Sequence, residues 1–212
     1  MPEPPESLMP VRLDTGERRS PAILSGPDSA RPAAVLVLIA PAIDVNRDGE
    51  ADVLLIRRVD RGGHHGGQIA FPGGRAEPDD ADSIQTALRE AAEEVALDPV
   101  ACGIRLVGTL ETFWIPVSDY RVTPVLAIAE RRPDVTASEA EVAEILWVPV
   151  SAFLPGAPIE IVEADVLDFR IRYGAYALPG AQVWGATARI LGQLGAILAS
   201  ARAAGRPGQP ST

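Results

Sequence analysis

The feature that most limits the fold of this chain is an uninterrupted apolar run, Ala33 to Ile43, which reads AAVLVLIAPAI. Apolar residues without polar alternation over such a length are typical of a strand buried inside a sheet. A second apolar segment, Asp52 to Val59 (DVLLIRRV), follows a polar turn that contains Asp-Gly. Because Asp-Gly favours tight connections between strands, the two segments are predicted to form a hairpin.

Later segments extend this pattern to both strands and helices. β-branched and apolar residues cluster between turn signals in GIRLVGTLETF, VTPVLAIA and EVAEILWVPV, which predicts three more strands. IVEADVLDFRIRY predicts one or two late strands, and VSAFL a short helix. Apolar residues at helical spacing predict a helix around ALREAAEEV and a terminal helix in VWGATARILGQLGAILASARAA. We therefore expect an α/β fold with a mixed sheet between helices.

The composition is that of one folded domain. The chain has 212 residues, of which 47% are hydrophobic and 23% charged, close to the usual globular balance. Residues 1–32 are rich in proline and lack periodicity, so they are predicted to form a loosely ordered or draped leader. Residues 33–203 are expected to form the domain, and residues 204–212 a flexible tail.

Charge and cysteine content exclude several classes of protein. A formal net charge of −10 argues against a broad nucleic-acid-binding surface, which needs a basic face. Cys102 is the only cysteine, which rules out an internal disulfide and a cysteine-based zinc site. No apolar run has the length of a membrane span. We expect a cytoplasmic protein without a membrane or nucleic-acid partner.

Three glutamates lie close together on the first predicted helix. Glu90, Glu93 and Glu94 have the spacing i, i+3 and i+4, so their carboxylates converge within about one turn. The like charges repel, and Arg89 offsets only part of that repulsion. The helix by itself fits two interpretations, a solvated surface or a site for a hard cation such as Mg²⁺ or Mn²⁺.

The residues before the helix favour the cation site. FPGGRAEPDDAD followed by TALREAAEEVAL resembles the signature of the Nudix hydrolases, in which a glycine turn leads to a helix with an Arg-Glu-x-x-Glu-Glu core. Here the core is Arg89, Glu90, Glu93 and Glu94, and the turn is Gly73-Gly74. The resemblance implies a Nudix-type α/β/α sandwich and a hydrolase of nucleoside diphosphate linkages. It also implies that the three glutamates bind Mg²⁺ or Mn²⁺.

The sequence departs from the commonest signature at two places. From Gly74 to Arg89 the chain advances 15 positions, one more than usual, and the acidic residue within that interval is Asp80. Ala96 occupies the place where glycine commonly follows the helix. Similar changes occur in the branch of the family that resembles coenzyme A pyrophosphatases.

A longer stretch also resembles that branch. LLIRR ends at Arg58 and is followed by HHGGQIAFPGG, which matches the branch at His65, Gln68 and the Phe-Pro-Gly-Gly turn. One family arginine is missing, because its position is Gly63 and Arg61 lies two residues too early. The resemblance implies substrate contacts from Arg58, His65, Gln68, Gly73 and Gly74. The structural alternatives are a salt bridge at the strand edge for Arg58 and a loop cap for His65.

The resemblance also implies roles for the remaining residues. Arg89 is expected to orient a glutamate, and the glycine turn to let the backbone approach a pyrophosphate. Glu93 or Glu94 could activate water, but some Nudix enzymes use a glutamate from a later loop. Glu141 in ASEAEV is our hypothesis for such an auxiliary base or ligand, with a solvated turn as its alternative. Phe113 and Trp114 are candidates for an adenine platform, against the more usual core position.

Three functions follow as hypotheses. The first is hydrolysis of coenzyme A or its thioesters to adenosine 3′,5′-bisphosphate and 4′-phosphopantetheine or its acyl form. The second keeps the chemistry but acts on ADP-ribose or a dinucleotide such as NADH. The third is a nucleotide-binding regulatory module with little turnover, against which the intact glutamates argue. The partner in each is a small nucleotide, and a homodimer is left open.

Overall fold

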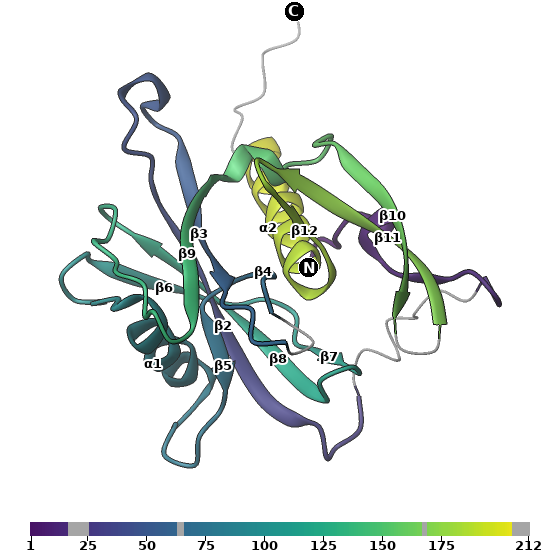
Figure 1. The fold of residues 1–212 in the computed structure, drawn as a ribbon. Helices are drawn as coiled ribbons and strands as arrows, with labels where there is room; N and C mark the ends of the chain where they lie inside the picture. The colour runs from purple at the N-terminus through teal and green to yellow at the C-terminus, as the bar shows by residue number, and fades with distance from the viewer. Residues whose placement is uncertain (17–25, 63–65, 167–168, 205–212) are drawn as a thin grey trace, which may run out of the picture.

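The computed structural model describes residues 1–16, 26–62, 66–166 and 169–204. Within these residues the chain forms an eight-stranded sheet, a four-stranded sheet and two α-helices. The helices are α1 (Ser83–Val95) and α2 (Gly185–Ala204), and the short 3-10 helices are η1 (Glu6–Leu8), η3 (Val45–Arg47) and η4 (Val150–Phe153). Figure 1 shows α1 on one side of the larger sheet and α2 on the other.

The larger sheet is mixed. Its strands are β2 (Arg31–Pro41), β3 (Ala51–Arg58), β4 (Ile69–Ala70), β5 (Gly73–Arg75), β6 (Ile104–Thr109), β7 (Phe113–Ile115), β8 (Tyr120–Ala129) and β9 (Val142–Pro149). The main order is β4-β3-β2-β8-β6, while β5 pairs with β2, β7 with β8 and β9 with β3. β2 and β8 run parallel and the other pairs antiparallel. The predicted hairpin is confirmed, because β3 returns antiparallel beside β2.

Strand β2 explains the continuous apolar run. Leu36 and Leu38 pack in the core on the α1 side together with Ala87 and Ala91 of that helix. Val37 and its alternating neighbours pack in the second core with residues of α2. Both faces of the strand are therefore buried, which removes the polar alternation of a half-exposed strand. The predicted arrangement of a mixed sheet between helices is confirmed.

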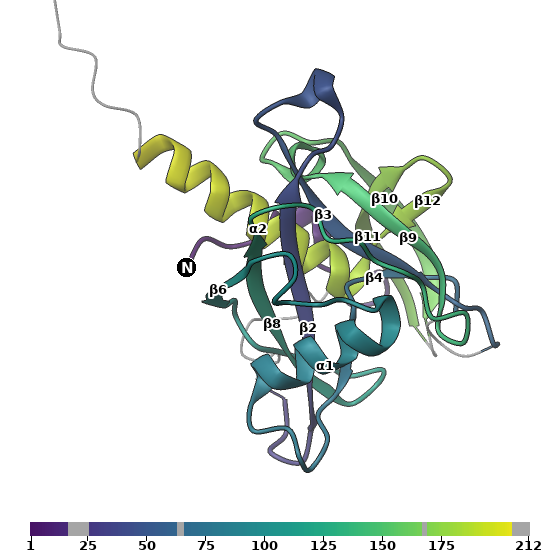
Figure 2. The ribbon, with the colours of Figure 1, turned by 90° about the vertical axis from the view of Figure 1, so that its left-hand side faces the viewer.

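A smaller antiparallel sheet covers the other side of α2. It consists of β1 (Val11–Arg12), β10 (Ile159–Val166), β11 (Phe169–Leu178) and β12 (Ala181–Val183), in the order β1-β11-β10 with β12 also on β11. Figures 1 and 2 show α2 between the two sheets. The sequence predicted the late strands but not this separate sheet, because its first strand comes from the opposite end of the chain.

Part of the expected leader packs on the domain. Leu8 is only 1% exposed and belongs to the core around α2, and β1 pairs with β11 through Val11 and Arg12. η1 and β1 are therefore the parts of the expected leader that lie against the domain, because Leu8 supplies apolar surface that the high proline content concealed. β2 also begins two residues earlier than expected, at Arg31. No helix in the described ranges is long and apolar enough to cross a membrane.

Helix α1 has a regular start and a strained end. The Asp82 carboxylate accepts a hydrogen bond of 2.9 Å from the Gln85 N–H, which caps the first turn. At the other end Ala96 has φ +52°, in the left-handed region where glycine is preferred. Alanine is disfavoured there because its Cβ approaches the backbone.

We expect Ala96→Gly to raise the free energy of unfolding by about 1 kcal/mol, because the substitution relieves this strain. Ala92→Gly is the matched control. Ala92 is exposed within the same helix, so glycine there should lower the free energy of unfolding by about 1 kcal/mol. Urea unfolding measures both variants. Equal destabilisation by the two glycines would contradict the account of the helix end.

Candidate active site

The end of β3, the strand β5 and the helix α1 meet around Glu94. This carboxylate is fully buried, and its Oε2 accepts a hydrogen bond of 2.8 Å from the Gly73 N–H. The Arg58 Nη1 donates to its Oε1 at 3.0 Å. The Glu94 side chain thus contacts both Arg58 and Gly73, two residues that the sequence singled out in separate segments. The Arg58 contact is the strand-edge ion pair considered as its structural alternative.

Glu90 lies directly against Gly74, which with Gly73 belongs to the short strand β5 instead of the predicted turn. A Cβ added to Gly74 would come within 2.5 Å of the Glu90 carboxylate atoms, so only glycine leaves room for this side chain. The Glu90 side chain is 15% exposed and that of Glu93 is 57% exposed. Gly73 therefore contacts Glu94 through its backbone N–H, and Gly74 leaves the space that the Glu90 side chain fills.

Arg89 links the helix to the preceding loop. Its Nε and Nη2 donate to the two carboxylate oxygens of Asp80 at 3.1 and 3.0 Å. The same guanidinium lies 3.1 Å from Glu90 and 3.3 Å from Glu93. These ion pairs hold Arg89 beside both glutamates. The hydrogen bonds from Arg89 are the largest of the effects that hold the pKa of Asp80 far below its usual range.

Burial and mutual repulsion raise the pKa values of two glutamates. Burial raises the pKa of Glu94 to about 7, and the charges of Glu90 and Glu141 act in the same direction, against Gly73 and Arg58. Burial also raises the pKa of Glu90, with a smaller contribution from Glu141. Glu141 therefore acts electrostatically on both, although it is far from them in sequence. The side chain of Glu141 is exposed, and its negative charge acts on Glu90 and Glu94.

The donor chemistry of Glu90, Glu93 and Glu94 fits a hard divalent cation. Carboxylate oxygens are the ligands that Mg²⁺ and Mn²⁺ prefer, and a cation would relieve the repulsion that raises the two pKa values. Among the described residues, no group of three or more His, Cys, Asp or Glu side chains is placed so that it could hold a metal ion as it stands. Arg58 and Arg89 instead provide the positive charge beside the carboxylates.

The other proposed substrate contacts have different outcomes. The Gln68 carbonyl accepts a hydrogen bond of 3.0 Å from the Arg58 N–H, which places Gln68 at the end of β3. His65 lies outside the described residues, so its proposed contact stays a prediction. Sequence reasoning missed the contact of the Arg61 guanidinium with the Ala140 carbonyl. No local pattern signals it, because the two residues are 79 positions apart.

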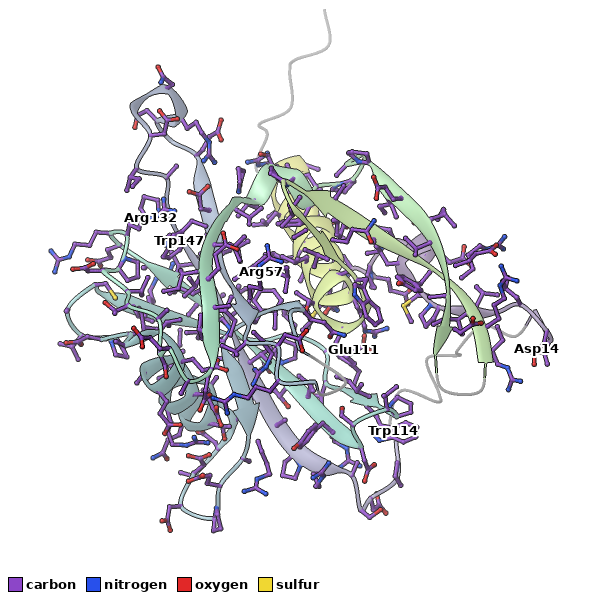
Figure 3. All side chains as sticks on the ribbon, viewed as in Figure 1. Asp14, Arg57, Glu111, Trp114, Arg132 and Trp147 are labelled. Atoms are coloured by element: carbon purple, nitrogen blue, oxygen red, sulfur yellow. The ribbon has the colours of Figure 1, made fainter. Side chains whose placement is uncertain are left out.

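The aromatic candidates belong mainly to the packing of the fold. Phe113 is 4% exposed, and the guanidinium of Arg189 lies 4.9 Å from its ring centre. Phe113 is therefore wrong as a candidate adenine platform. The Trp114 Nε1 donates to Asp119 at 3.0 Å. Figure 3 shows Trp147 beside Arg132 and well separated from Trp114. These tryptophans do not form a shared stacking surface.

Comparisons with known proteins show which family this chain resembles. Residues 35–167 match the family model described as NUDIX domain. A curated relative from Yersinia pestis (strain Pestoides F), described as the uncharacterized Nudix hydrolase NudL, is 34% identical over 147 residues, which span 68% of this chain and 71% of the relative.

Two solved structures have a similar fold. The Nudix hydrolase RenU from M. smegmatis has a TM-score of 0.51 at 20% identity, covering 95% of this chain and 98% of its own. A MutT/nudix family protein from Enterococcus faecalis also has a TM-score of 0.51, at 17% identity, covering 82% of this chain and 64% of its own. At these identities the likeness concerns the fold alone.

Proposed function

The chain belongs to the Nudix hydrolase family, and we propose that it hydrolyses the diphosphate of coenzyme A or an acyl-coenzyme A with Mg²⁺ or Mn²⁺. The products would be adenosine 3′,5′-bisphosphate and 4′-phosphopantetheine or its acyl form. The observation that carries this proposal is the contact of Glu94 with both Gly73 and Arg58. It joins the Nudix helix to two segments that resemble the coenzyme A branch.

The proposed reaction transfers a phosphoryl group to water. The water oxygen forms a bond to phosphorus, the bridging P–O bond breaks, and the leaving phosphate keeps the electron pair. A bound divalent ion would supply charge neutralisation and acidify the water, and Glu90, Glu93 and Glu94 are the proposed ligands. The water proton goes to a carboxylate, for which Glu93, Glu94 and Glu141 are the candidates. Burial favours proton uptake by Glu94.

The chain's own groups would position the substrate. We propose that the Gly73-Gly74 backbone lies along the diphosphate, because the missing Cβ of Gly74 leaves room for the carboxylate of Glu90, a proposed metal ligand. Arg58, His65 and Gln68 are the proposed contacts with the rest of the nucleotide. Arg89 positions Glu90 and Glu93 rather than substrate, since its guanidinium is already occupied by Asp80 and these glutamates.

A second substrate class is ADP-ribose or a dinucleotide such as NADH. The observation that favours it is Gly63, which replaces the arginine expected in the coenzyme A branch. The third candidate, a binding module without turnover, is less favoured because all three helix glutamates are present. A cytoplasmic location and a homodimer also stay predictions, and light scattering would test the latter.

We expect kcat/KM for coenzyme A to exceed that for dephospho-coenzyme A by about tenfold or more, because a charge-assisted contact with the 3′-phosphate is lost in the shorter substrate. ADP-ribose and NADH complete the panel, with Mg²⁺ and Mn²⁺ tested separately. Faster cleavage of ADP-ribose or NADH would overturn the coenzyme A assignment and keep the reaction. Nucleotide binding without cleavage of any substrate would favour the binding module.

A further inference from the structure

The turn that carries Glu141 is attached to the end of helix α1. The Thr136 N–H donates to the Val95 carbonyl at 2.9 Å, and the Ser138 N–H donates to the Glu94 carbonyl at 2.9 Å. These carbonyls are free to accept because the last turn of a helix lacks intrahelical partners. The chain before Glu141 is therefore fixed to the residue whose side chain lies at the centre of the site.

The turn closes on itself and is attached to β3 on its other side. The N–H groups of Glu141 and Val142 both donate to the Ser138 carbonyl, at 2.9 and 2.8 Å. The Val59 N–H, just after β3, donates to the Glu141 carbonyl at 3.0 Å. The Arg61 guanidinium donates to the Ala140 carbonyl. Arg61 thus supplies a side-chain contact between the end of β3 and the turn.

This attachment opposes an electrostatic repulsion. Glu141, Glu90 and Glu94 carry like charges, and the turn that holds Glu141 is hydrogen-bonded to the Glu94 carbonyl through the Ser138 N–H, so these carboxylates repel one another. This repulsion favours positions of the Glu141 side chain farther from the helix. The bonds from Val59 and Arg61 to adjacent carbonyls of the turn oppose movement in that direction.

The course of the chain after Arg61 is consistent with this role. The Gly62 N–H donates to the Asp60 carboxylate at 2.9 Å, and Gly62 has φ +76°. The chain therefore turns immediately after Arg61 while the guanidinium contacts the carbonyl of Ala140. The arginine that lies two residues too early for the substrate contact of the coenzyme A branch has a different partner in this protein.

We propose that Arg61 is a positioning residue that holds the Glu141 turn beside Glu90 and Glu94. This inference rests on the proposed hydrolysis, in which Glu141 acts as an auxiliary base or ligand. Arg61 itself contacts neither the substrate nor the reacting atoms. Its effect on turnover should therefore pass through Glu141.

A double-mutant cycle tests the coupling on the diphosphate substrate that the wild-type protein cleaves fastest. Arg61→Gln is expected to lower kcat about fivefold and to leave KM within about twofold, with partial rescue by Arg61→Lys. In a Glu141→Gln background the same change should cause no further loss. A rise in KM at constant kcat, or a full fivefold loss in both backgrounds, would overturn the proposal.

Amide hydrogen exchange of the folded, metal-free protein provides a readout that does not depend on activity. Arg61→Gln should increase exchange at Glu141 and Val142, whose N–H groups close the turn. Arg57→Gln is the control, because Arg57 contacts Glu144 and the Gly180 carbonyl. Unchanged exchange in Arg61→Gln would overturn the inference even in an active enzyme. A wild-type protein that cleaves no diphosphate would instead refute the proposed hydrolysis.

Discussion

Replacing Glu94 by glutamine is expected to lower kcat by about a thousandfold or more while the chain stays folded. The change removes one negative oxygen from the three helix glutamates, which are the proposed ligands of the divalent ion. Glutamine keeps the shape of the side chain and an oxygen that can accept the Gly73 N–H. Steady-state kinetics on the best diphosphate substrate measure the loss. Glu163→Gln, on β10, is the control and should retain wild-type turnover.

The same substitution should change the pH dependence of stability. The pKa of Glu94 in the folded protein is about 7, above its ordinary value of 4.5, because the carboxylate is buried. The folded state therefore binds a proton more tightly than the unfolded state, and stability falls as pH rises from about 4.5 to 7. Urea unfolding without metal at pH 5 and pH 8 should show a smaller difference for Glu94→Gln. If the stability of Glu94→Gln differed between pH 5 and pH 8 by as much as that of the wild type, or by more, burial of the Glu94 carboxylate would not explain the pH dependence.

Alanine at the two adjacent glycines is expected to have two different effects. Gly73 has φ +153°, and a Cβ there would lie 2.4 Å from the Ala34 carbonyl oxygen and 2.6 Å from the Val35 Cα. These atoms belong to the backbone of the central strand β2, which cannot move without breaking its pairing. Gly73→Ala should therefore lower the free energy of unfolding by about 3 kcal/mol or more.

At Gly74 the obstacle is the end of a flexible side chain, the Glu90 carboxylate at 2.5 Å. Gly74→Ala should displace Glu90 at a cost of about 1 kcal/mol in stability, and lower kcat by about a hundredfold because a proposed metal ligand is moved. Urea unfolding and turnover, measured on both variants, separate the effects. A Gly74→Ala protein with full activity would contradict the position assigned to Glu90.

Local patterns predicted the elements that position the site. The hairpin of β2 and β3, the helix α1 and the mixed sheet between helices follow from apolar periodicity and turn residues, which act over short distances. The grouping of Glu90, Glu93 and Glu94 with Gly73-Gly74 followed from a resemblance to a known motif. That these glutamates bind a metal stays a prediction, which Glu94→Gln and Gly74→Ala test.

Contacts between distant segments could not be predicted in the same way. The ion pair of Arg58 with Glu94 joins residues 36 positions apart, and the bond of Arg61 to Ala140 joins residues 79 apart. The smaller sheet requires Val11 to pair with Arg172. Contacts between residues so far apart depend on how the whole chain packs. Secondary-structure propensity and apolar periodicity are local and carry no information about such packing.

The most direct test of the central claim is a product analysis of purified protein incubated separately with coenzyme A, ADP-ribose and NADH, each with Mg²⁺, with Mn²⁺ and with EDTA. We expect adenosine 3′,5′-bisphosphate and 4′-phosphopantetheine in equal amounts with either metal and no cleavage in EDTA. Equal cleavage in EDTA, or no metal-dependent cleavage of coenzyme A, ADP-ribose or NADH, would contradict the assignment of Glu90, Glu93 and Glu94 to a metal-dependent diphosphate hydrolase.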